Sequence, residues 1–203
     1  MDKVDNYVKG LIKILLNTKN KVLYYVFITM IIGIISDSHD DIINVKQTIK
    51  IFNEYKVDYV IHAGDYIYPG IVLQFKDLNK NIKFVGVLGN NDGEKMGLVK
   101  SFISIAGDLK GDFGELNLDN EVFGIYHGTN EDLKRSLILA NYYDILICGH
   151  THKKDNRKIN KTQILNPGSA HRDLQNDESN KMASIIIYYT GLKKYEYVEL
   201  NKS

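Results

Sequence analysis

The sequence predicts an α/β protein, and two features of its apolar segments lead to this fold class. Apolar runs alternate with amphipathic segments over residues 31–103, an order of strand and helix that is typical of parallel βαβ units. Five apolar runs of the chain end directly in Asp, Asn or His. Ligands of open α/β sheets bind outside the carboxyl ends of the strands, so these endings predict one shared functional site.

The composition is that of one globular domain. A chain of 203 residues suffices for one substantial core, and 44% hydrophobic with 25% charged residues is ordinary for such a domain. The formal net charge of +1 gives no support for nucleic acid as a bulk partner. The single cysteine, Cys148, lies in an apolar run and is expected to be a small buried side chain. It forms no internal disulfide, so we expect a cytoplasmic protein, and no run has the length and purity of a membrane span.

Residues 1–29 differ in character from the rest of the chain. Their first half predicts a short amphipathic helix, because apolar residues recur there at helical spacing: Val4, Tyr7, Val8, Leu11, Ile12 and Leu15. An apolar segment follows this helix. A signal peptide is disfavoured, because no small-residue cleavage site precedes the strand that follows. We expect residues 1–29 to be an N-terminal extension, either an overextended start before Met30 or a packing appendage, and residues 30–203 to be the domain that carries the functional site.

The first half of this domain predicts three strands and three helices. The strands span residues 31–36, 58–63 and 82–88, and the helices span about 41–55, 69–77 and 95–103. Asp40 or Asp41 can cap the first helix, and Pro69 suits the first turn of the second.

The second half is more mixed and predicts a second sheet. Residues 114–118 and 122–126 form a predicted hairpin, and short strands are expected at 144–148, 157–160, 162–165, 183–189 and 193–200. A helix over residues 131–141 is expected to begin at Thr129 or Asn130 and to face Leu133, Leu137 and Ala140 inward. The strands are too many and too mixed for one parallel layer.

The polar strand endings contain side chains that commonly bind metals. Seven such residues follow the five runs: Asp37, His39, Asp65, Asn90, His127, His150 and His152. His150 and His152 would share a face on an extended strand, but Gly149 lets the chain turn, so their rings can also diverge. A bare His-Thr-His would fit a loop with two exposed histidines, and the other four endings favour a site instead.

Carboxylate, imidazole and amide oxygen together suit a borderline divalent ion such as Mn, Fe, Co, Ni or Zn. Seven ligands exceed the need of one ion, so two divalent metal ions are expected, with Asp65 as the bridging carboxylate. Two ions about 3.5–4 Å apart activate a shared water and clamp both oxygens of an in-line displacement. This is the chemistry of phosphoester hydrolysis.

Five motifs in order resemble the calcineurin-like metallophosphoesterases, particularly their small bacterial and archaeal single-domain phosphodiesterases. The motifs are Asp37-x-His39, Gly64-Asp65, Gly89-Asn90-Asn91-Asp92, His127-Gly128 and Gly149-His150-Thr151-His152. The resemblance covers residues 30 to about 200 and implies a four-layer α/β/β/α sandwich of two mixed sheets flanked by helices. It implies Asp37, His39, Asp65 and His152 on one metal, and Asp65, Asn90, His127 and His150 on the other.

The activity that this resemblance implies is that of a dimetal-dependent phosphodiesterase. A metal-bridging hydroxide would attack a small-molecule phosphoester in line, with Asp65, Asn90, Asn91 and His150 in catalytic roles. Many family members have His at the position of Asn91, and Asn cannot donate a proton as a general acid. Thr129 also departs from the His of close relatives. Asn166-Pro167-Gly168-Ser169 matches a family loop near the site, with Arg172 as the candidate for its arginine.

The competing interpretation is a protein-interaction scaffold of the same fold that has lost metal ligands. Every ligand position of this chain holds a competent residue, which favours an enzyme. His62, inside a strand, is expected to be a hydrogen-bonded core residue, and His171 receives no role. The substrate, the identity of the metals and the oligomeric state, monomer or dimer, are left open.

Overall fold

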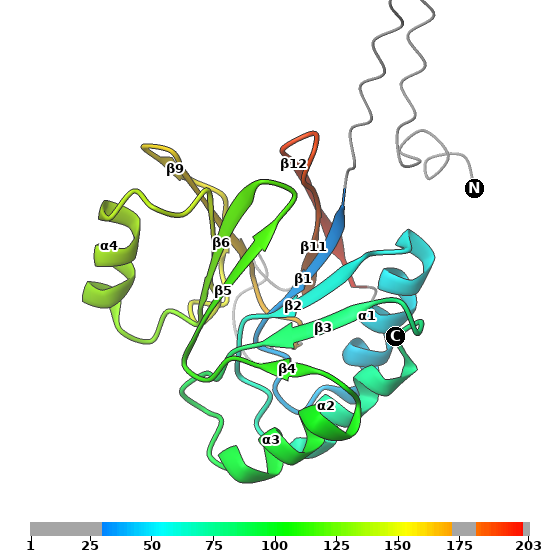
Figure 1. Cartoon of the computed structure of the whole chain (residues 1–203). Coiled ribbons are helices and arrows are strands. Elements are labelled where there is room, and N and C mark those ends of the chain that lie inside the picture. The colour runs from blue at the N-terminus through cyan, green and yellow to red at the C-terminus, as the bar shows by residue number, and fades with distance from the viewer. Residues whose placement is uncertain (1–29, 172–181, 201–203) are drawn as a thin grey trace, which may run out of the picture.

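The structure is a computed structural model that describes residues 30–171 and 182–200. Two six-stranded β-sheets pack face to face, and helices cover their outer faces (Figure 1). The α/β class and the two mixed sheets flanked by helices are therefore confirmed. Within the described residues, no helix is both long enough and apolar enough to cross a membrane.

The first sheet contains the parallel strands that the sequence predicted. Its order is β12-β11-β1-β2-β3-β4, in which β1 to β4 are parallel and β11 runs antiparallel to both of its neighbours, β1 and β12. The strands are β1 (Ile31–Ile35), β2 (Tyr59–His62), β3 (Lys83–Gly86), β4 (Asp108–Leu109), β11 (Ser184–Tyr189) and β12 (Lys194–Glu199). The helices between its strands are α1 (Ile42–Tyr55), α2 (Pro69–Gln74) with the 3₁₀ turn η2 (Phe75–Asp77), and α3 (Lys95–Ser104).

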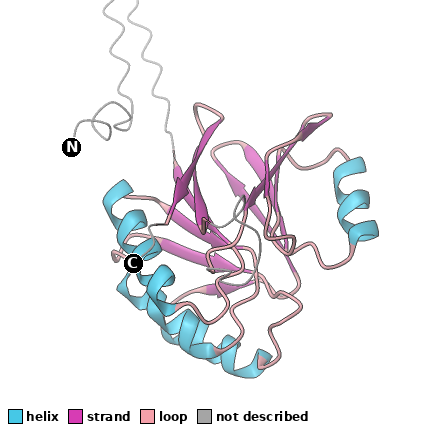
Figure 2. Ribbon diagram, turned by 180° about the vertical axis from the view of Figure 1, so that it is seen from behind, coloured by secondary structure: helices cyan, strands magenta, loops and turns pink. Residues whose placement is uncertain are grey.

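The second sheet has the order β5-β6-β7-β10-β8, and β9 also pairs with β10. Its strands are β5 (Phe113–Leu118), β6 (Glu121–Tyr126), β7 (Ile145–Ile147), β8 (Lys154–Asp155), β9 (Lys158–Ile159) and β10 (Thr162–Pro167). Strands β6, β7 and β10 are parallel, and α4 (Glu131–Leu139) connects β6 to β7. Figure 2 shows α4 on one side of the two sheets and α1, α2 and α3 on the other.

Three apolar cores lie between the four layers. Because side chains alternate along a strand, Ile31 and Ile35 of β1 pack toward the helices, while Ile32 and Ile34 pack toward the second sheet. On β7, Leu146 instead joins the core beneath α4. Both sheets are thus covered on two faces, which explains why their central strands are nearly continuous apolar runs.

Local signals predicted most element boundaries correctly. The Asp41 carboxylate accepts a hydrogen bond from Asn44 N at 3.0 Å and caps α1, and Asn130, not Thr129, caps α4. Cys148 is buried as expected, and burial raises the pKa of its thiol to about 12. The two-residue strands β4 and β8 were not predicted, because they are too short to show a periodicity.

The predicted inward face of α4 was wrong at two positions. Leu133 is 46% exposed and Ala140 is exposed, whereas Lys134 and Ile138 are buried and Leu137 is half-buried. The buried face of α4 therefore contains Lys134 and Ile138, and Leu133 lies outside it. The aliphatic part of Lys134 packs near the loop after β6, and its Nζ lies 3.6 Å from Glu131 Oε1, so a lysine can occupy this face.

Candidate metal centre

The carboxyl ends of parallel strands from both sheets meet at one place and bring the five polar endings together. Strands β1, β2 and β3 of the first sheet and β6 and β7 of the second each end beside this region. The loops after them carry all seven predicted metal ligands. Parallel alignment is the cause, because it places the carboxyl ends of neighbouring strands at the same edge.

One group of potential ligands consists of Asp37, His39 and His152, whose ligand atoms all lie within 4.8 Å of one another. His152 Nε2 is 3.3 Å from Asp37 Oδ1, and the Nε2 atoms of His39 and His152 are 3.2 Å apart. Asp37 is fully buried, while the side chain of His152 is 41% exposed. This group therefore opens to solvent on its histidine side.

A second group consists of Asp37, Asp65 and His127, which are all buried. His127 Nε2 lies 3.3 Å from Asp65 Oδ2, 3.9 Å from Asp37 Oδ1 and 3.1 Å from Asn90 Oδ1. The other ring nitrogen, Nδ1, is 2.7 Å from the carbonyl oxygen of Ala63, to which it donates a hydrogen bond. A backbone acceptor of this kind orients metal-binding histidines and directs the second nitrogen toward the ion.

The rings of His150 and His152 point to different groups. His150 packs edge-on against His127 with ring centroids 5.3 Å apart, and His152 packs edge-on against His39 at 5.1 Å. The two histidines therefore diverge, with His150 nearer the buried group. Asp37 belongs to both groups. The bridging role of Asp65 expected from the sequence therefore stays a prediction.

The carboxylates change the pKa values of the surrounding groups. Burial raises the pKa of Asp65, but hydrogen bonds from His127 and Asn91 outweigh this effect and lower it below the ordinary value. Burial lowers the pKa of His127, but Asp65 and Asp37 raise it overall, and the hydrogen bond to Asp37 raises the pKa of His152. For His39, burial and then His152 lower the pKa. The carboxylates thus favour positive charge at His127 and His152, and a metal cation can supply such charge in place of protons.

The donor set fits a divalent metal ion. In the neutral form of His127, with the proton on Nδ1 donated to Ala63, the lone pair of Nε2 faces the oxygen atoms of Asp65, Asp37 and Asn90. Lone pairs that face one another repel unless a proton or a cation lies between them. Carboxylate, imidazole and amide ligands without thiolate suit a borderline ion such as Mn, Fe, Co, Ni or Zn.

The ligand loops have an unusual backbone conformation that the sequence analysis did not foresee. Left-handed φ angles occur at Asp37 (52°), His39 (44°), Asp65 (62°), His150 (67°) and His152 (56°). Non-glycine residues rarely adopt this conformation, and such strain is concentrated at functional sites. Gly64 precedes Asp65 with φ of 101°, and a Cβ there would lie 2.8 Å from Gly89 N, so the two loops approach too closely for a side chain.

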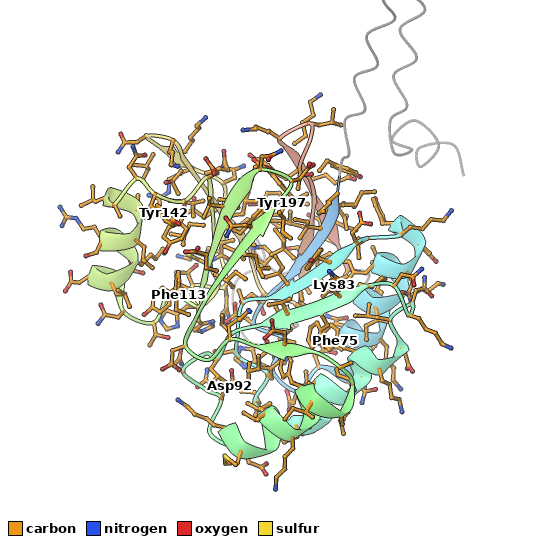
Figure 3. All side chains as sticks on the ribbon, viewed as in Figure 1. Phe75, Lys83, Asp92, Phe113, Tyr142 and Tyr197 are labelled. Atoms are coloured by element: carbon orange, nitrogen blue, oxygen red, sulfur yellow. The ribbon has the colours of Figure 1, made fainter. Side chains whose placement is uncertain are left out.

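Asp92 lies beside the predicted ligands, in a position for which its sequence motif predicted no role. Its buried carboxylate accepts hydrogen bonds from four backbone amides, at Gly89 (2.7 Å), Tyr66 (2.7 Å), Ile67 (2.9 Å) and Asp65 (3.0 Å). These bonds join the loops after β2 and β3; Figure 3 labels Asp92. Its position two residues after Asn90, within the Gly89-Asn90-Asn91-Asp92 motif, is the sequence feature that could have placed Asp92 near the predicted ligands.

Two polar loops hold the loops of the predicted ligands in place through hydrogen bonds. Asn91 donates to both oxygens of Asp65, from its backbone N at 2.9 Å and from Nδ2 at 2.8 Å. Asn166 Nδ2 donates to the carbonyl oxygen of Gly149 at 2.8 Å, and Ser169 Oγ donates to that of Asp37 at 2.9 Å. The Asn-Pro-Gly-Ser loop therefore lies beside the site as the resemblance implied. Arg172 lies outside the described residues.

The two remaining histidines have different positions. His62 is fully buried, accepts a hydrogen bond from Gly64 N at 3.2 Å and lies 2.9 Å from Ser38 Oγ, so it is a satisfied core residue as predicted. Burial lowers the pKa of His62 well below its ordinary value. His171, which the sequence analysis left without a role, lies at the site with its ring centroid 5.3 Å from that of His39.

The fold and this donor set together define an α/β sandwich protein with a metal-binding type of site where its two sheets meet. The chain belongs to the calcineurin-like phosphoesterase superfamily, because the family model for the "Calcineurin-like phosphoesterase superfamily domain" matches residues 30–188. Hydrolysis of phosphoric esters is the class of reaction that this family defines.

Relatives of known name agree with this assignment. The chain is 36% identical over 140 residues to a phosphodiesterase of Methanocaldococcus jannaschii, covering 68% of this chain and 83% of the relative. It is 31% identical over 146 residues to a probable metallophosphoesterase of Mycoplasma genitalium, covering 67% and 74% respectively.

Solved structures show the same fold. An archaeal phosphodiesterase superimposes with a TM-score of 0.77 at 32% identity, covering 84% of this chain and 100% of that one. Vacuolar Protein Sorting 29 from Cryptosporidium parvum superimposes with a TM-score of 0.58 at 17% identity, over 86% and 99% of the two chains. The second likeness shows the fold alone.

Proposed function

We propose that the chain is a dimetal-dependent phosphodiesterase that hydrolyses a P–O bond of a small-molecule phosphodiester. The observation that carries this proposal is the pair of ligand groups at the strand ends, which share Asp37. The phosphodiesterases among the relatives favour a diester over a monoester substrate.

The proposed roles follow from the positions of the side chains. Asp37, His39, Asp65 and His152 would hold one ion, and Asp65, Asn90, His127 and His150 the other. When bound, two divalent ions supply an activated water and positive charge for the phosphoryl group. The protein's own contribution is to fix the ligands: Ala63 orients His127, and Asn91 and Asp92 hold the loop of Asp65.

Metal binding and turnover test this function together. Purified protein is stripped with a chelator, reloaded with Mn or Ni, and assayed for metal content and for activity on a panel of phosphomonoesters and phosphodiesters. We expect about two metal ions per chain and metal-dependent hydrolysis of diesters. Asp65→Ala should abolish this turnover for every substrate, while Glu54→Ala, at an exposed position in the last turn of α1, should retain it.

The alternative function is a protein-interaction scaffold of the same fold. We retain this alternative because the chain shares its fold with Vacuolar Protein Sorting 29. Absence of bound metal above background in the reloaded protein would overturn the enzyme proposal and favour the scaffold. The filled ligand positions favour the enzyme. We further propose a reducing, cytoplasmic setting, since the one cysteine, Cys148, is buried without a disulfide.

A further inference from the structure

A small pocket beside the more exposed ligand group has no assigned function. It has a volume of about 370 Å³ and is lined by His39, Asp40, Ile67, His152 and His171. His39 and His152 are occupied as metal ligands under the proposed function. A phosphoester whose phosphorus lies at the metal centre would extend into this adjacent space.

His171 is the lining residue that remains able to donate a hydrogen bond to a substrate. Ile67 is apolar, and the carboxylate group of Asp40, which is 72% exposed to solvent, serves as an acceptor and not as a donor. An imidazole has an N–H donor in both its neutral and its protonated form, so this capacity does not depend on the charge of the ring.

The backbone fixes His171 relative to the predicted ligands. His171 N donates to the carbonyl oxygen of Asp37 at 3.1 Å and to Ser169 Oγ at 3.0 Å. Ser169 Oγ itself donates to Asp37 O at 2.9 Å. The position of the imidazole is thereby coupled to the loop that carries Asp37, as a substrate-positioning group requires.

The ring of His171 has one buried and one available nitrogen. Nδ1 is shielded from solvent, has no hydrogen-bond partner within the described part of the chain, and lies 3.9 Å from Asp40 Oδ1, beyond hydrogen-bond distance. The side chain as a whole is 35% exposed and lines the pocket, which leaves Nε2 as the ring nitrogen that can meet a ligand there. A phosphoryl oxygen at Nε2 can only accept and therefore selects the form with a proton there.

We propose that His171 binds a nonbridging phosphoryl oxygen of the substrate, and of the phosphate group of the product, through Nε2. The role rests on the proposed phosphodiesterase function and concerns binding, not proton transfer to the leaving group. Ile67 forms the apolar wall of the same pocket in a left-handed conformation (φ 70°), held by the bond of its N to Asp92 at 2.9 Å. That wall supplies no competing hydrogen bond.

Binding of inorganic phosphate to the Mn-loaded protein, measured by isothermal titration calorimetry, tests this role without relying on activity. A hydrogen bond to a charged group predicts about tenfold to a hundredfold weaker phosphate binding in His171→Ala. His171→Gln, whose amide nitrogen extends about as far as Nε2, should restore most of the affinity. His171→Asn, which extends only about as far as Nδ1, should not. Lys100→Ala, the loss of an exposed cation on α3, should have no effect.

Steady-state kinetics with the same variants separates binding from proton donation. His171→Ala should raise KM with unchanged metal content and an unchanged dependence of rate on leaving-group pKa. A steeper dependence would make His171 a proton donor and overturn the binding role. Equal phosphate affinity in wild type and His171→Ala, with metal bound in both, would overturn the inference alone. Absence of metal in the wild type would overturn the proposed function and the inference with it.

Discussion

At the scale of single residues, hydrogen bonds from neighbouring groups set the orientation of several predicted metal ligands, Asp37, Asp65 and His127 among them. Asp37 Oδ2 accepts from Ser36 Oγ at 2.6 Å and from His150 N at 3.1 Å. His127 donates backward to Ala63, as described above. Such outer partners orient ligands before the ion binds, so substitutions around the ligands should affect metal affinity as well as stability.

Asn91 gives a prediction about the leaving group. Because an amide cannot protonate a departing alkoxide, the rate should decline steeply as the leaving-group pKa rises. Asn91→His should flatten this decline, with gains of up to about 10²–10⁴ on poor leaving groups, the usual effect of a general acid. The measurement is kcat/KM across a series of aryl and alkyl phosphodiesters.

Asn91→Ala serves as the control for that series, since Asn91 also donates to Asp65 and its loss can weaken metal binding. Its metal content should be measured, and its leaving-group dependence should stay steep. A flat dependence in the unmodified protein would show that another residue protonates the leaving oxygen.

Glu121 gives a prediction about pH. Its side chain is 4% exposed, and burial raises its pKa despite the hydrogen bond from Tyr188 Oη at 2.9 Å. The folded state therefore binds the proton more tightly than the unfolded state. This contribution to stability is complete below the unfolded pKa of about 4.3 and is lost as pH rises through the folded pKa.

Glu121→Gln should accordingly raise the melting temperature at pH 7, and its advantage should shrink as pH falls through the folded pKa and be lost below about pH 4. Thermal unfolding from about pH 3 to about pH 8 measures this difference. Glu115→Gln, at an exposed position on the adjacent strand β5, should show no such trend. An equal advantage at every pH would contradict the titration of Glu121 as the cause.

At the scale of elements, α4 packs on the smallest of the three apolar cores of the described fold. It stands apart from α1, α2 and α3 on the opposite side of the two sheets (Figure 2). Its core contains few buried residues, namely Ile138, Leu146, Cys148 and Ile164. The stability of this layer should therefore depend strongly on single side chains.

Neighbouring residues of α4 provide a matched test. Ile138 is 8% exposed and Leu139 is 60% exposed. Ile138→Ala should cost about 2–4 kcal/mol in the free energy of unfolding, because it leaves a cavity, whereas Leu139→Ala should cost less than about 0.5 kcal/mol. Urea denaturation measures both. Similar costs at the two positions would show that the Ile138 side chain does not hold α4 against the second sheet.

At the scale of the whole molecule, the site depends on both sheets. Asp37, His39, Asp65 and Asn90 follow strands of the first sheet, and His127, His150 and His152 follow strands of the second. The core between the sheets, which includes Ile34, Ile61 and Ile147, therefore also fixes the distance between the two sets of ligands.

Residues 1–29, which lie outside the described residues, give a prediction at this scale. We propose that residues 30–203 are the catalytic domain and that the extension is dispensable. Met30 N donates to Thr190 Oγ1 at 2.9 Å, and Thr190 N donates to Met30 O at 3.1 Å, so the described fold is anchored from Met30 onward. Deletion of residues 1–29 should leave a folded, metal-binding and active protein.

Circular dichroism, metal content and activity of the truncated chain measure this outcome. The full-length protein is the control at the same concentration. Loss of folding on deletion would show instead that Leu11, Leu15 and their neighbours cover part of a core.

Sequence alone determined the elements whose signals are local. The apolar runs, the narrowing of the helix caps to Asp40 or Asp41 and to Thr129 or Asn130, and the Asp119-Asn120 turn of the β5–β6 hairpin all depend on neighbouring residues. The ordered strand endings also identified seven ligand-type residues, because parallel strands must bring their carboxyl ends together.

Tertiary structure alone decided what depends on contacts between distant segments. The inward face of α4 follows from packing near the loop after β6, and local periodicity at Leu133 could not show it. The left-handed backbone of the ligand loops, and the joining of two of them by Asp92, likewise arise from close approach of different strands. His171 reaches the site because its amide binds Asp37 O, 134 positions earlier in the chain, a contact between segments too far apart for any spacing in the sequence to encode.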